Sequence, residues 1–281
     1  PDYAIATDGT VTIDGNEGNY NIMWDGETLT LKDATIEGAH TFESDFFLKK
    51  AAAIYRDGDL TIQLEGKEST VHNPGIQTER EDADIYGIRI TGNLTIQGSG
   101  TLKVTSASKY IDGNNYGIYA NNVINSSMVE AIGGPAKGND YASCGIFGDV
   151  TVNGGTVKAT GSKVENDGSN SYGIFGNVNV NQDSELTAIG GEAIAFDDFY
   201  TSGSSYGISG TVIVNDSSIV VATGDKADRQ SYGISGSTTV NGGEVTATGN
   251  TAGVYAEGSG QVTVGNGLAV YVGDSKDDAA V

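Results

Sequence analysis

Residues 145–161 read GIFGDVTVNGGTVKATG, and residues 117–133 (GIYANNVINSSMVEAIG) and 233–249 (GISGSTTVNGGEVTATG) align with them without a gap. A tripeptide Tyr-Gly-Ile or a close variant opens such units at Gly87, Gly117, Gly145, Gly173, Gly207, Gly233 and Gly253. The glycines are 30, 28, 28, 34, 26 and 20 residues apart. The sequence is therefore a repeat, and its length varies in the linker between one unit and the next.

Each unit holds three short alternating stretches, such as Gly-Ile-Phe-Gly, Val150–Val152 and Val157–Ala159, separated by turn-forming residues. Strands this short cannot bury a face alone, but stacked repeats bury a continuous core. The pattern predicts an all-β parallel β-helix, a solenoid of about nine three-strand coils. We expect one domain over residues 1–281, with irregular coils and a cap over 1–52, regular coils over 53–272, and a tail or the start of a further segment over 273–281.

Alternation along a strand predicts which side chains face inward. One isoleucine per unit forms an inward column, namely Ile88, Ile118, Ile146, Ile174, Ile208 and Ile234. The residue two positions earlier has the same parity, so Tyr116, Cys144, Tyr172, Tyr206 and Tyr232 are expected to line an inner corner. Cys144 is then a buried thiol rather than a nucleophile. Asparagines recur eight residues after the glycine, at Asn125, Asn153, Asn181, Asn215 and Asn241. Asparagine tolerates the left-handed backbone conformation, and its amide can bond to its copy in the next coil, so the pattern predicts a ladder of hydrogen-bonded asparagines.

The composition narrows the class of protein. The chain has 42 glycines, few aromatic residues and a formal net charge of −22, which disfavours nucleic acid and anionic lipid surfaces as partners. It has no apolar run long enough to insert into a membrane. A single cysteine excludes an internal disulfide framework. The Thr/Asn/Gly/Asp bias favours an extracellular or bacterial cell-surface location, and we expect a monomer.

Three sequence segments resemble those of known proteins. They are MWDGETLTLKDATIEG (23–38), AIYRDGDLTIQLEG (53–66) and YGIRITGNLTIQGSG (86–100). The units resemble right-handed parallel β-helices of the pectin-lyase-like superfamily, and these segments are similar to clostridial surface proteins described as carbohydrate-binding domain proteins. The resemblance implies a right-handed helix. It also implies that any chemistry lies on the outer face of one sheet, where acids hold calcium or share protons and an Arg or Lys acts as base or charge stabiliser.

An outward column follows the inward isoleucines. It contains Tyr55, Arg89, Tyr119, Phe147 and Phe175, followed by Ser209, Ser235 and Tyr255. Exposed rings one strand apart are expected to offer flat faces to sugar rings. The alternative is that linkers fold over the column and make it a covered hydrophobic cluster. Arg89 suits a uronate, or equally a cation–π pair with a neighbouring tyrosine. The 191–206 linker adds Phe196, Phe199 and Tyr200 as candidate ligand-binding residues.

Metal and catalytic candidates are few. A corner column of Asp59, Asn93, Asn121, Asp149 and Asn177 offers oxygen ligands for Ca²⁺, although Asx residues are also the usual turn formers. Asp197 and Asp198, in the longest of the central linkers, are two further candidate metal ligands. The hydrolase signatures of the superfamily (Asn-Thr-Asp, a strand-mounted Asp-Asp, Gly-His-Gly and Arg-Ile-Lys) are missing. We therefore assign no catalytic residue; Arg89, beside Asp57 and Asp59, is one candidate base among four arginines.

The sequence favours a non-catalytic secreted or cell-surface β-helix that binds polysaccharide, either plant cell-wall or host glycan, or acts as an adhesin. The alternative is a calcium-dependent polysaccharide lyase that acts on a uronate-containing glycan. A third possibility is a structural spacer without a ligand.

Overall fold

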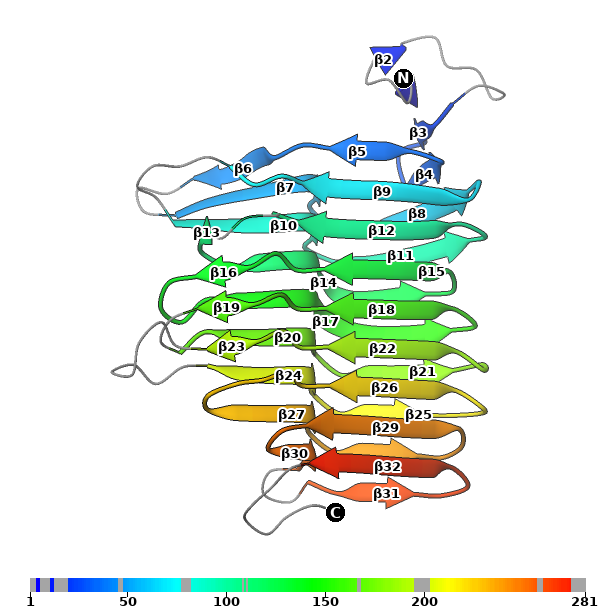
Figure 1. Ribbon diagram of the computed structural model, residues 1–281. Coiled ribbons are helices and arrows are strands. Elements are labelled where there is room, and N and C mark those ends of the chain that lie inside the picture. Colours follow the sequence, from blue (N-terminus) through cyan, green and yellow to red (C-terminus); the bar gives the residue numbers. More distant parts are fainter. Residues whose placement is uncertain are drawn as a thin grey trace.

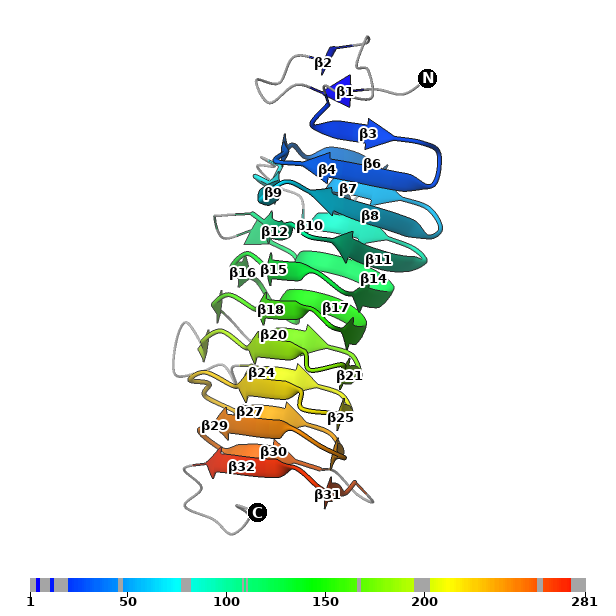
Figure 2. The same cartoon turned by 90° about the vertical axis from the view of Figure 1, so that its right-hand side faces the viewer.

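The computed structural model describes residues 4–5, 11–12, 20–44, 48–76, 82–107, 109, 111–165, 168–194, 203–256 and 260–273. These residues form strands, turns and extended segments. Strands of successive repeats stack along one axis and pair mostly in parallel, which makes long sheets that run along that axis (Figures 1 and 2). In this part of the chain no helix has the length and hydrophobicity needed to cross a bilayer. The expectation of an all-β structure built from parallel strands is confirmed.

Three faces make up the stack. The first is formed by strands β7 (Leu48–Arg56), β10 (Asp82–Ile90), β14 (Asn115–Asn125), β17 (Ala142–Asn153), β20 (Asn170–Phe175), β24 (Ser204–Ser209), β27 (Gln230–Ser235) and β30 (Ala252–Tyr255). The second is formed by β4 (Thr28–Lys32), β8 (Leu60–Glu65), β11 (Asn93–Gly98), the ends of β14 and β17, β21 (Val178–Asn181), β25 (Val212–Val214), β28 (Thr238–Val240) and β31 (Val262–Val264). The first and second faces belong to one 17-stranded sheet because β14 and β17 bend from one face to the other.

The third face is a separate nine-stranded sheet. It contains β5 (Thr35–Glu37), β9 (Glu68–Asn73), β12 (Thr101–Ser106), β15 (Met128–Ile132), β18 (Thr156–Thr160), β22 (Glu185–Ile189), β26 (Ile219–Thr223), β29 (Glu244–Gly249) and β32 (Leu268–Gly273). The linkers that follow it add a short fourth sheet of β13 (Ile111–Asp112), β16 (Ala136–Lys137), β19 (Val164–Glu165) and β23 (Ala193–Ile194). Within each of these two sheets, every strand pairs in parallel with strands of neighbouring repeats.

Antiparallel strands occur at the N-terminal end. Strand β3 (Ile22–Trp24) pairs antiparallel with β4, and β6 (His40–Ser44) pairs antiparallel with β7. A separate two-stranded sheet joins β1 (Ala4–Ile5) to β2 (Val11–Thr12). Parallel stacking on the second face already begins at β4, which pairs with β8. This end of the stack therefore starts with reversed strands that pair with the first members of the parallel sheets.

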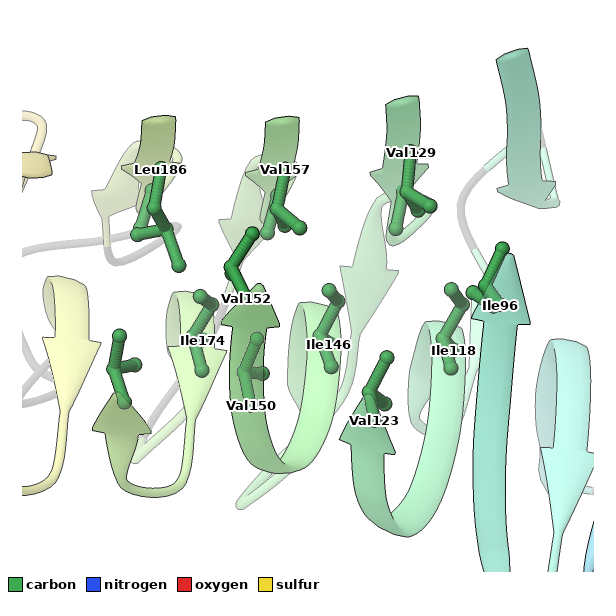
Figure 3. Packing of buried hydrophobic residues seen from close by; sticks show 14 of the residues in the cluster. Ile96, Ile118, Val123, Val129, Ile146, Val150, Val152, Val157, Ile174 and Leu186 are labelled. Atoms are coloured by element: carbon green, nitrogen blue, oxygen red, sulfur yellow. The ribbon is translucent and has the colours of Figure 1, made fainter. Parts of the chain in front are cut away.

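The isoleucine column is confirmed. The isoleucines lie opposite one another in successive strands and are fully buried, namely Ile88, Ile118, Ile146, Ile174, Ile208 and Ile234. Figure 3 shows three of them, Ile118, Ile146 and Ile174, pointing into the core. The glycine before each isoleucine is required by the close approach of backbones. A Cβ on Gly145 would lie 2.4 Å from the Thr160 nitrogen and 2.7 Å from the Gly173 oxygen. Only glycine fits where the first and third faces meet.

The gapless alignment of the 117–133 and 145–161 units is wrong in its middle. Tyr119 lies opposite Phe147, but the next paired residue, Asn122, lies opposite Asp149, so β14 bulges by one residue. The offset is restored by Met128, which lies opposite Thr156. Two expectations change as a result. Asn122, not Asn121, occupies the corner column, and Asn125 lies opposite Val152 instead of Asn153.

The asparagine ladder is confirmed for four of its five members. The Nδ2 of Asn181 donates to Asn153 Oδ1 at 3.0 Å, and the same bond recurs from Asn215 to Asn181 and from Asn241 to Asn215, both at 2.7 Å. Asn125 is outside the ladder, and its side chain bonds the backbone of Ser127 instead. The left-handed backbone expected at the asparagines lies one residue later, as at Gln182 and Asp216.

Candidate functional site: an aromatic column on the first face

The tyrosines of the Tyr-Gly-Ile motifs lie on the outer side of the first face, so their expected place at an inner corner is wrong. Tyr86, Tyr116 and Cys144 form a cluster with Tyr119 and Phe147, separate from the main core. The reason is the glycine that follows each tyrosine. A Cβ on this glycine would point into the interior, and the side chain of the next isoleucine points there too, so side chains do not alternate strictly between inside and outside at this position. The tyrosines therefore pack against the outward aromatic column.

The outward rings stack on one another along the repeats. The ring centroids of Tyr119 and Phe147 are 4.4 Å apart with planes 8° apart, and those of Phe147 and Phe175 are 5.0 Å apart at 15°. Tyrosines of the motifs meet these rings edge-on, as Tyr172 meets Phe175 at 5.0 Å and 79°. Such offset-stacked and edge-to-face pairs stabilise the first face. They also place each face of the Phe147 ring against a neighbouring ring.

This arrangement corrects the expectation of separate flat faces. Phe147 and Tyr119 are half-buried, whereas Phe175 is 39% exposed. Phe175 stacks on Phe147 on one side only, because the next residue in the column is Ser209. The rings cover one another, so the open ring face of the stack is at its Phe175 end.

Arg89 is held by the same stack. Its guanidinium carbon lies 3.9 Å from the centre of the Tyr119 ring and 5.7 Å from that of Tyr86. Its Nη1 donates a 2.7 Å hydrogen bond to the Ile90 carbonyl oxygen. Of the two roles considered for Arg89, these contacts favour the cation–π pair, which accounts for its position without any ligand.

Tyr55 belongs to the N-terminal part of the column. It is 41% exposed and stacks at 4.2 Å and 9° on Phe42 of the antiparallel strand β6. One of its ring faces is therefore covered by a neighbouring strand. Five other candidates, Phe196, Asp197, Asp198, Phe199 and Tyr200, lie outside the described residues.

The corner column forms hydrogen bonds between repeats. Asp59 Oδ1 accepts hydrogen bonds from the backbone nitrogen of Asn93 at 2.7 Å and from its Nδ2 at 3.2 Å. Asp149 Oδ1 accepts one from the backbone nitrogen of Asn177 at 2.8 Å. Asp59 and Asp149 are three strand spacings apart, or ~14 Å, too far to ligate one ion. Within the described ranges no group of three or more His, Cys, Asp or Glu side chains is arranged to hold a metal ion.

Cys144 replaces a tyrosine in the motif column. Its side chain is fully buried, and its Sγ donates to the Ile146 carbonyl oxygen at 3.0 Å. Burial raises the pKa of the Cys144 thiol to about 12. Because the thiolate is the nucleophilic form, this thiol is unreactive at neutral pH, which agrees with the expectation of a buried core residue.

Comparisons with protein-family models, with curated proteins and with solved structures found no match to this chain.

Proposed function

We propose that the chain is a right-handed parallel β-helix of about nine three-strand coils, related to the pectin-lyase-like superfamily, and that it binds polysaccharide or acts as an adhesin outside a bacterial cell. The protein binds its glycan without cleaving it. The parallel pairing of successive repeats supports the helix, and the acidic surface agrees with a role away from nucleic acid and anionic lipid.

The observation that carries the binding function is the open end of the aromatic column. A solvent-facing ring at Phe175 lies at the end of a stack whose other members hold it rigidly in place. The apolar C–H face of a sugar ring buries against such a surface without a large entropy cost to the protein.

The contacts of the lyase candidates favour binding over catalysis. A lyase base has to reach a proton of the substrate, yet Arg89 is stacked on Tyr119 and bonded to a backbone carbonyl. The carboxylates of Asp59 and Asp149 accept backbone N–H groups of the next repeat. Each of these side chains has a structural partner that explains why its residue type is needed.

The test is affinity electrophoresis of the purified protein through gels that contain pectin, xylan, glucomannan, arabinogalactan or mucin, combined with absorbance assays for unsaturated sugar products with and without calcium. We expect at least one polysaccharide to retard the protein and no unsaturated product to form. Retardation by none would indicate a spacer or a protein-binding adhesin. Product formation would establish the lyase instead.

A further inference from the structure

The aromatic column is interrupted for two repeats. Phe175 lies opposite Ser209, Ser209 opposite Ser235, and Ser235 opposite Tyr255. Two small hydroxyl side chains therefore stand where the preceding repeats have rings. We call this interruption the step. It spans the two repeats that carry Ser209 and Ser235 on the first face, between Phe175 and Tyr255.

Both residues that border the step are exposed. Phe175 is 39% exposed and Tyr255 is 41% exposed, and each is stacked with a ring of another repeat. The partner of Phe175 is Phe147, and the partner of Tyr255 is Tyr232 at 4.9 Å and 8°. On the same strand as Ser209, the half-buried Tyr206 stacks on Tyr172 at 5.1 Å. The step thus combines exposed ring surface at its borders with two serine hydroxyls between them.

The step is also uncharged. Strands β20, β24, β27 and β30 read NSYGIF, SSYGIS, QSYGIS and AGVY and contain no charged residue, in a chain of net charge −22. A charged ligand would find no ion-pair partner on these strands. A neutral ligand with apolar C–H faces and hydroxyl groups matches rings and serines together.

We propose that the step is the primary sugar subsite, and that it takes a neutral pyranose stacked on the open face of Phe175 and hydrogen-bonded to the Ser209 hydroxyl. Tyr255 lies three strand spacings, or ~14 Å, from Phe175 at the far end of the step, and its ring stacks on Tyr232 of the intervening strand β27. This inference rests on the proposed function and adds that the ligand is a neutral glycan and that its binding is centred on Ser209.

Ser209→Phe is the decisive variant. It turns β24 from SSYGIS into SSYGIF, and β20 shows that a phenylalanine at this position packs edge-on against the motif tyrosine and stacks on the ring of the preceding repeat. The variant therefore extends the ring stack by one repeat, covers the open face of Phe175 and removes the Ser209 hydroxyl, while Ser235 leaves the second repeat of the step unfilled. We expect an unchanged or higher melting temperature together with the loss of glycan binding.

Matched variants separate the subsite from the rest of the column. Isothermal titration with xylohexaose, cellohexaose, mannohexaose and a galacturonate hexamer measures affinity, and thermal unfolding is followed in parallel. Phe175→Ala should weaken binding of a neutral hexamer at least tenfold. Phe147→Ala, whose ring faces are covered, should lower the melting temperature more and the affinity less. Ser235→Ala should change either quantity little.

Two results would overturn the inference and leave the proposed function standing. One is that Ser209→Phe binds neutral hexamers as well as the unaltered protein does. The other is that the galacturonate hexamer is the tightest ligand. If the unaltered protein binds no glycan in either the titrations or the electrophoresis, the proposed polysaccharide-binding function fails as well, so the two failures are distinguishable.

Discussion

Thr238 is a polar side chain in an apolar column. Along the second face it stands in line with Val123, Val150, Val178, Val212 and Val262, which occupy the corresponding place in other repeats. Its side chain is fully buried, and its hydroxyl has no hydrogen-bond partner among the residues that the structure describes. We therefore predict that Thr238→Val stabilises the protein.

The size of the effect follows from the lost hydroxyl. A buried hydroxyl without a partner costs ~1–3 kcal/mol, because its hydrogen bonds to water are not replaced. Valine has the same branched shape and exchanges the hydroxyl for a methyl group, which gains about 1 kcal/mol of burial. The neighbouring valines show that the site accepts that shape. We expect the free energy of unfolding to rise by about 2–4 kcal/mol.

The measurement is urea unfolding followed by circular dichroism, together with hydrogen exchange of the amides in β25, β28 and β31. Exchange is needed because stacked repeats can open locally instead of unfolding in one step. Thr239→Val is the control, since Thr239 points outward beside Ile213 and should change stability little. Equal or lower stability of Thr238→Val would refute the reasoning and show that the hydroxyl is satisfied, for instance by an internal water.

Three further predictions concern the core, the pH and calcium. Ile146→Asp should lose cooperative unfolding, since an unpaired buried carboxylate costs several kcal/mol, and wild-type-like melting would contradict the buried column. Burial raises the pKa of three tyrosines, Tyr86, Tyr116 and Tyr172, above the ordinary value of 10. Their stabilising contribution is complete below pH 10 and is lost as the pH rises toward the folded-state pKa values. Urea unfolding should therefore show lower stability at pH 11 than at pH 8, and equal midpoints would argue against buried rings. Calcium should raise the melting temperature more than sodium at matched ionic strength, because a net charge of −22 favours a bound divalent ion, and equal shifts would make the acids a solubilising surface only.

The repeat period and the inward column could be predicted from sequence because both depend on spacing alone. An isoleucine after six of the seven motif glycines, and Val254 after the seventh, identifies the same strand position in each repeat, and its burial follows from the need for a common core. The asparagine ladder was predictable for the same reason, since an amide can bond its copy one repeat away.

Other features could not be predicted from spacing. The bulge in β14 adds a residue after Tyr119, and the offset is restored before Met128, so a gapless alignment conceals it. Strict alternation along the strand predicted that the motif tyrosines face inward. That prediction is wrong because the Cβ position of the motif glycine and the side chain of the following isoleucine both point inward. The stacking of the Phe147 and Phe175 rings depends on side-chain torsions that a sequence does not display. The antiparallel strands β3 and β6 lie where the repeat is weakest.

The direction of the strands determines how the molecule responds to force. In Figure 1 the strands run across the long axis, so the hydrogen bonds between repeats lie along it. A pull applied between β3 and β32 loads the bonds of all repeats together, and a terminal repeat, which has a neighbour on one side only, can peel away while the others stay intact. Each repeat that peels releases about 30 residues, or ~100 Å of extended chain, in place of one strand spacing of ~4.8 Å. Stretched from its two ends, such a stack lengthens in steps, and each step lowers the tension along the chain.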